Sequence, residues 1–262
     1  MTACLLVVCE AAADFRTASE LVDRVLCERV EWLEPTLLPS VRQWWEYDSE
    51  HPFLLWPSLK ETVQRLGLQR LRPRSRFNGE LGAPDAAAAD IALQFAAWIQ
   101  KSADVAAVLL IRDTDKDEER RRGLEQARIL DGHSWPFSIV LGVAHPRREA
   151  WVLTGFEAQD SGEAARLKLQ QERLGYDPCA NSEQLTASSK GAGPDPKRVH
   201  RDAKRVLHDL TGGDFEREAQ CWRSTPLARL KARGQANGLA SYLQELEDQL
   251  VPLFSPRSTP RP

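Results

Sequence analysis

Residues 105–115, with the sequence VAAVLLIRDTD, decide the predicted fold. The part from Val105 to Ile111 is an uninterrupted apolar run, which is typical of a strand buried on both faces in a helix-covered parallel sheet. The run stops at Arg112, and Asp113 and Asp115 follow at once. The stretch therefore predicts a buried parallel strand with two carboxylates at its exit.

Two further apolar runs, Leu5 to Cys9 and Phe137 to Val143, have the same character. Helical patterns lie between the three runs: one follows the first run, one begins near Pro84, and a charged one extends from Lys116 to Leu130. Strands that alternate with helices are typical of parallel sheets with helices on both faces. We therefore predict an α/β fold with a doubly wound, mainly parallel sheet.

The remaining segments depart from this alternation. One is irregular and rich in Trp, Pro and Arg; another is rich in Ser, Gly, Pro and Asn and has no periodicity. The predicted regions, in chain order, are an α/β domain at 1–178 with an insertion at about 31–85, a loop or linker at 179–196, a helical extension at 197–254 and a disordered tail at 255–262.

Carboxylates follow two of the predicted strands. Glu10 comes directly after Cys9, and Asp113, Asp115 and Asp117 come directly after Ile111. Ligand sites in open α/β sheets form at the carboxyl ends of the strands, so we expect these side chains to meet. Clustered carboxylates raise one another's pKa unless a cation joins them, and hard oxygen ligands suit Mg²⁺ or Mn²⁺. The alternative is that they are helix caps and solvated loop residues.

The pattern of strand and Glu, helix, then strand and Asp-x-Asp resembles the Toprim domain of topoisomerases, bacterial primases and overcoming-lysogenization-defect (OLD) nucleases. The resemblance is closest to small standalone Toprim-related proteins found beside ATPases, which also carry a Pro-x-x-Glu-Ala-Trp-type segment. Here that segment is Pro146 to Leu153, with the sequence PRREAWVL. The resemblance covers residues 4–156, and Ala11 stands where Toprim domains usually have Gly.

The resemblance implies a metal-dependent nuclease that works with a separate ATPase partner, in defence against phage. Asp113 and Asp115 would hold the metal, Glu10 would ligate a metal or act as general acid or base, and Glu149 would complete a second metal position. The alternative is a non-catalytic Toprim-like subunit of a larger complex, which the Ala11 departure favours. A receiver-like signalling domain with Asp113 as phosphoacceptor would need a second acid after the first strand, and a manganese sugar-nucleotide transferase would need a nucleotide-binding signature.

Basic residues are the second part of the nuclease hypothesis. The Arg120, Arg121 and Arg122 run is predicted to be a solvated face, because acidic residues precede it. Groups that could contact DNA phosphates lie in an alternating arginine run and on a predicted helix. These predicted nucleic-acid-binding residues are Arg70, Arg72, Arg74, Arg76, Lys197 and Lys204.

The composition sets the remaining limits. The net charge is −3, so a nucleic-acid partner has to be met by a local patch. No GxxxxGK[ST] motif is present, so an ATPase activity would have to come from a partner. The first residues have neither a basic segment nor an apolar run of signal-peptide length, and the five cysteines include no CxxC pair. We expect a cytoplasmic protein with reduced thiols and no membrane contact.

Overall fold

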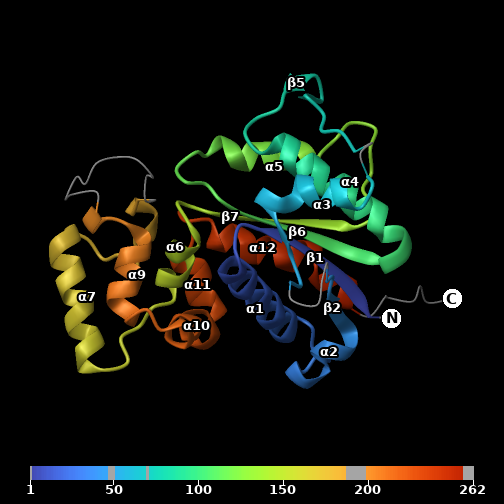
Figure 1. Cartoon of the computed structure of the whole chain (residues 1–262). Helices are drawn as coiled ribbons and strands as arrows, with labels where there is room; N and C mark the ends of the chain where they lie inside the picture. Colours follow the sequence, from blue (N-terminus) through green and yellow to red (C-terminus); the bar gives the residue numbers. More distant parts are fainter. Residues whose placement is uncertain (1, 47–50, 69–70, 187–198, 256–262) are drawn as a thin grey trace.

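The computed structural model describes residues 2–46, 51–68, 71–186 and 199–255. Its centre is a parallel sheet in the order β2-β1-β6-β7, with β3 paired to β1 on the same side as β2 (Figure 1). The inner strands lie where the apolar runs predicted them, because every residue of these runs can be buried without a polar partner. The strands are β1 (Ala3–Cys9), β2 (Arg42–Trp44), β3 (Leu54–Leu55), β6 (Val105–Asp113) and β7 (Ser138–Ala144).

Helices cover both faces of the sheet, which confirms the predicted doubly wound class (Figure 1). Alternate strand residues enter two separate cores: Leu5 and Val7 face one, and Leu6 and Val8 face the other. The first core includes residues of α1 (Ala12–Arg29), α6 (Arg148–Thr154) and α12 (Leu239–Gln249), and the second includes residues of α3 (Leu59–Arg65), α4 (Ala86–Ala103) and α5 (Glu119–Arg128).

The prediction that 31–85 lies outside the sheet is wrong in part, because this segment supplies β2 and β3. These strands are only two or three residues long, and such a length shows no periodicity in the sequence. Ser58 precedes α3 but does not cap it with its side chain; its hydroxyl donates to the Leu55 carbonyl instead. The remaining elements here are η1 (Pro35–Leu37), α2 (Leu38–Val41), η2 (Trp56–Ser58) and the hairpin of β4 (Arg76–Phe77) and β5 (Glu80–Leu81).

The C-terminal helices pack into the same core as the sheet. Tyr242 of α12 stacks on Trp151 with ring centroids 5.0 Å apart, and its hydroxyl donates to the Ala18 carbonyl. The predicted extension is therefore continuous with the α/β core. The sequence of this region shows two amphipathic patterns, Val199 to Leu210 and Leu239 to Leu253, and the structure has further helices between them. Apart from α12, the described elements after α6 are α7 (Ser161–Leu174), η3 (Ser182–Gln184), α9 (Ala203–Thr211), α10 (Phe215–Ser224), α11 (Leu227–Arg233) and α13 (Val251–Phe254).

The sequence from Leu153 to Leu174 predicts a helix after a turn near Gly155. In the structure α6 ends before Gly155 and α7 begins at Ser161. A Cβ on Gly155 would lie 2.0 Å from the Cys221 carbonyl oxygen, so the close approach of α10 requires glycine. In the predicted linker 179–196, Cys179 and Leu185 are buried, whereas 187–196 lie outside the described residues. Most of the predicted tail, 256–262, also lies outside them.

Candidate metal and phosphate site

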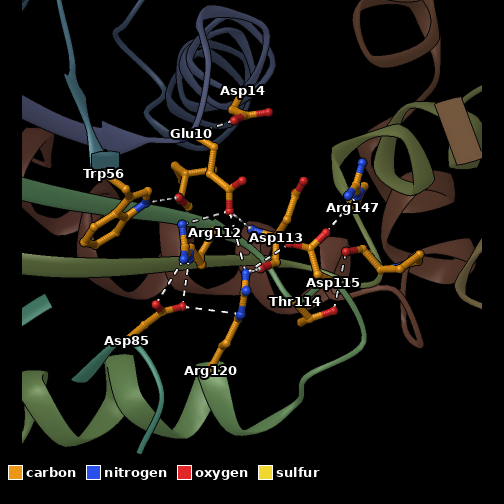
Figure 2. Close-up of polar contacts among 12 residues, drawn as sticks. Glu10, Asp14, Trp56, Asp85, Arg112, Asp113, Thr114, Asp115, Arg120 and Arg147 are labelled. Atoms are coloured by element: carbon orange, nitrogen blue, oxygen red, sulfur yellow. Dashed lines mark hydrogen bonds and ion pairs between the residues drawn. The ribbon is translucent and has the colours of Figure 1, made fainter. Parts of the chain in front are cut away.

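The carboxyl ends of β1 and β6 bring Glu10 and Asp113 together. The two strands are parallel neighbours, with Val8 opposite Leu110, so both chains leave the sheet at the same edge. The Asp113 backbone N–H lies 3.4 Å from Glu10 Oε1 (Figure 2). Residues 103 positions apart in the sequence thus share one site, as the topology predicted.

Asp115 reaches the same site through a tight turn after β6. Asp115 and Lys116 have φ angles of 49° and 70°, a left-handed conformation that costs energy in residues other than glycine. Hydrogen bonds hold this turn: the Asp115 N–H donates to the Pro146 carbonyl, and the Lys116 N–H donates to Thr114 Oγ1. The backbone reverses there. Asp117, predicted as a metal ligand, is exposed and accepts from the Glu119 N–H at the start of α5, away from the cluster.

Arginines lie between the carboxylates of this site (Figure 2). Arg112 makes two hydrogen bonds to Asp85, at 2.7 and 3.0 Å, and its Nη1 lies 3.0 Å from Glu10 Oε1. Arg147 Nε donates to Asp115 Oδ1 at 2.8 Å. Site residues therefore come from the loop before α4, from β6 and from the loop after β7.

Asp14 is a further carboxylate that the sequence did not reveal. It lies in the first turn of α1 and its Oδ2 accepts from the N–H groups of Glu10 and Ala11, at 3.2 and 2.9 Å. These bonds fix the backbone that carries Glu10. Burial, together with the nearby Glu10 and Glu149, raises the pKa of Asp14 to about 6, although Arg148 opposes the rise.

Asp113 is the most strongly perturbed acid of the cluster. Burial of its carboxyl raises its pKa well above the usual range, and the charges of Asp14, Glu10 and Glu149 raise it further. The Arg148 N–H donates to Asp113 Oδ1 at 2.9 Å and only partly offsets these effects. Strongly shifted acids in one cluster are typical of functional sites.

Glu149 and Arg148 close the inner side of the cluster. Glu149 is 7% exposed, and within the described residues its Oε2 has no hydrogen-bond partner. Arg148 lies 3.6 Å from Glu149 Oε1 and 3.1 Å from Glu218 Oε2, which is in α10. A buried carboxylate oxygen without a partner is costly, and this makes Glu149 Oε2 an exception among buried polar atoms.

The donor set fits a divalent cation of the magnesium type. Its members are carboxylate and carbonyl oxygens, the ligands that Mg²⁺ and Mn²⁺ prefer, and the partnerless Glu149 oxygen is one of them. In the part of the chain that the structure describes, however, no three His, Cys, Asp or Glu side chains already converge tightly enough to hold a metal. Arg112 pairs with Glu10, and Arg120 pairs with Asp115.

The predicted nucleic-acid-binding residues do not form one row of arginines. Arg74 forms an ion pair with the buried Asp90, and its backbone N–H donates to the same carboxylate. These contacts attach the loop that contains Arg74 to α4. Arg72, Arg76 and Lys204 are exposed. Lys204 lies in α9, away from the β4–β5 hairpin that carries Arg76 (Figure 1). Arg70 and Lys197 lie outside the described residues.

Comparisons with known proteins leave the resemblance as a prediction. The chain matches no family model, no curated protein and no solved structure. None of the helices in the described residues combines the length and apolar character that crossing a bilayer requires.

Proposed function

We propose that the chain is a divalent-metal-dependent protein that acts on phosphodiesters, with Glu10, Asp113, Asp115 and Glu149 as its metal-binding carboxylates. The observation that carries the proposal is the position of Asp113 beside Asp14, Glu10 and Glu149: burial of its carboxyl raises its pKa, and the charges of these three acids raise it further. Carboxylates kept so close destabilise one another unless a cation neutralises them. The partnerless Oε2 of Glu149 supports the same conclusion.

A bound Mg²⁺ or Mn²⁺ would polarise a phosphate oxygen and lower the pKa of a coordinated water. The chain's own residues would position the reactants. Asp14 holds the backbone of Glu10 through two hydrogen bonds, and Arg148 holds Asp113 through its N–H. Glu10, which is 30% exposed at its side chain, would take or return a proton at the solvent side of the cluster.

We further propose that the substrate is DNA and that a separate ATPase works with this chain in defence against phage. This part rests on the Toprim resemblance and on the absence of a P-loop motif in the sequence. The exposed Arg72, Arg76 and Lys204 supply cationic groups for a nucleic-acid partner. The test is cleavage of plasmid DNA by this chain, alone and together with candidate ATPases encoded beside the gene. If the DNA stays intact in both cases at saturating Mn²⁺, the proposal is contradicted.

The second candidate is a non-catalytic regulatory subunit that retains this site. One observation favours it: Glu10 pairs with Arg112, and Asp115 pairs with Arg120 and Arg147, so arginines already balance part of the acidic charge. Such a subunit would fold and bind partners with equal affinity whether or not a metal was present. Metal-dependent cleavage of DNA, and not metal binding alone, therefore separates the two candidates.

Calorimetric titration with Mg²⁺ and Mn²⁺ tests the metal site. The wild type should bind, and the Asp113→Asn and Asp115→Asn variants should lose most of the binding. Asp117→Asn is the matched control, because Asp117 lies in the same turn but its carboxylate accepts only a local helix N-terminal hydrogen bond in the described contacts. Equal binding in the wild type and in Asp113→Asn would contradict the proposed ligand set.

A further inference from the structure

One nitrogen atom of Arg120 occupies the centre of the oxygen cluster (Figure 2). Its Nη1 lies 3.0 Å from the Asp113 carbonyl oxygen, 3.2 Å from Asp115 Oδ2 and 4.0 Å from Glu10 Oε1. The three oxygens come from the ends of β1 and β6 and from the turn that follows. A cationic nitrogen thus lies between two of the predicted ligand carboxylates, those of Glu10 and Asp115, and the backbone carbonyl of Asp113.

Arg120 differs from Arg112, the other guanidinium in contact with Glu10. Arg112 is fixed by two hydrogen bonds to Asp85, and its guanidinium carbon lies 5.6 Å from the Trp56 ring centroid. Arg120 reaches Asp85 only at 3.7 Å and makes its other contacts through Nη1 alone. Another cation can therefore replace the Arg120 guanidinium without breaking a two-point pair of the kind that Arg112 makes with Asp85.

The unpartnered Glu149 oxygen is independent evidence that a ligand is expected beside this cluster. Glu149 is more than nine-tenths buried, and among the described residues its Oε2 has no partner, even with Arg120 in place. Its charge contributes to the raised pKa of Asp113 and of Asp14. The guanidinium therefore does not complete the site.

We propose that Arg120 is a built-in counter-ion that occupies the metal position, and that its displaced guanidinium becomes the ligand of a substrate phosphate. A divalent cation and the Arg120 guanidinium repel each other at contact distance and would use the same oxygens of Glu10 and Asp115, so binding of one disfavours the other. Arg120 lies in the first turn of α5, next to the site, so its long side chain stays within reach after displacement.

The inference rests on the proposed metal site and names its regulation and its phosphate ligand. A purely structural Arg120 would stabilise the fold, and its loss would not increase metal affinity. A counter-ion makes the opposite prediction, since its loss removes a competitor. The same loss should weaken phosphate binding, because the guanidinium that would contact the anion is gone.

The experiment is calorimetric titration of Mn²⁺ into the wild type, Arg120→Gln and Arg122→Gln, followed by titration of inorganic phosphate into the Mn²⁺-loaded proteins. Arg122 is the matched control, because it loses the same charge from the same helix but pairs with Glu80 and Glu119 at the surface. We expect Arg120→Gln to bind Mn²⁺ about tenfold more tightly and phosphate at least about tenfold more weakly, with Arg122→Gln like the wild type.

Each outcome separates the two proposals. If the wild type binds Mn²⁺ tightly and Arg120→Gln binds it equally or more weakly, the counter-ion proposal is overturned and the proposed metal site stands. Absence of Mn²⁺ binding in all three proteins overturns the proposed metal site and the counter-ion with it. Arg120→Lys guards against misfolding of the first variant: a lysine keeps the competing charge, so its Mn²⁺ affinity should stay near that of the wild type.

Discussion

Two buried charge clusters in this molecule use the same residue types and differ in their balance. Between α7 and α10, the Glu163 carboxylate accepts hydrogen bonds from Arg217 Nε at 2.6 Å, from Arg217 Nη2 at 2.8 Å and from the Gln159 N–H at 2.8 Å. Both carboxylate oxygens are satisfied, and the hydrogen bonds from Arg217 lower the pKa of Glu163. At the end of β6, by contrast, Asp113 lies among acids and its pKa is raised.

The difference separates a structural ion pair from the proposed metal site. A buried pair with all its hydrogen bonds made fixes two helices against each other and leaves nothing for a substrate. A cluster with surplus acids and a partnerless oxygen costs stability that a bound cation would return. Variants at the two clusters should therefore change stability in opposite directions.

The largest expected effect is at the satisfied pair. Arg217→Met leaves Glu163 buried without its partner and should destabilise the protein by about 3–5 kcal/mol in urea unfolding. The double variant Glu163→Gln/Arg217→Met removes the orphaned charge and should recover much of the loss. A loss below about 1 kcal/mol for the single variant would show that the pair is solvated and that the comparison fails.

Asp14 should contribute to the pH dependence of stability, together with the more strongly shifted Asp113. The folded-state pKa of Asp14, about 6, lies above the value near 4 of an unfolded aspartate, so the folded chain binds this proton more tightly. The contribution is fully present below about pH 4 and is lost as the pH rises through 6, by an amount on the order of 3 kcal/mol.

Urea unfolding with a chelator, from about pH 4 to pH 8, measures this loss. Asp14→Asn keeps an oxygen for the N–H groups of Glu10 and Ala11 but has no charge, so its stability curve should be flatter than that of the wild type. Parallel curves for the two proteins would assign the pH dependence to other groups.

Asp113→Asn should give a smaller change, with the opposite sign to that of Arg217→Met. The amide oxygen can still accept from the Arg148 N–H, and the amide nitrogen adds a donor among acids. The metal-free variant should be more stable than the wild type by about 1–2 kcal/mol at pH 8, measured by thermal and urea unfolding. Destabilisation would mean that arginines already neutralise this cluster.

The smallest effect should come from Arg122→Gln. Its side chain is 54% exposed and pairs with Glu80 and Glu119, which are also exposed. Solvent screens such surface pairs, so unfolding midpoints should hardly move. A loss comparable to that of Arg217→Met would remove Arg122 as a control for the metal experiments.

The sequence predicted the parts of this fold that depend on burial along one strand. Leu5 to Cys9 and Val105 to Ile111 are apolar at every position because both faces of their strands are covered, and this signal is local. β2 and β3 were not predicted, since strands of two or three residues form only against an existing neighbour. The proximity of Glu10 and Asp113 followed from parallel topology alone.

The arginine side of the site could not be predicted from the sequence. Arg120 belongs to a run that was expected to be solvated, which Arg121 and Arg122 confirm through pairs with nearby glutamates. Arg120 instead contacts the Asp113 carbonyl and Asp115, across the left-handed turn at Asp115 and Lys116. The contact of Arg148 with Glu218 joins segments 70 residues apart, and no local pattern marks such a pair.

The most direct test of the central claim is a crystal structure of the full chain with Mn²⁺, in which anomalous scattering locates the ion. The account predicts one strong peak between Glu10, Asp113, Asp115 and Glu149, with Arg120 moved out of contact with the Asp113 carbonyl. An unchanged Arg120 and no peak at this cluster, at a Mn²⁺ concentration well above the Kd measured by calorimetry, would contradict it.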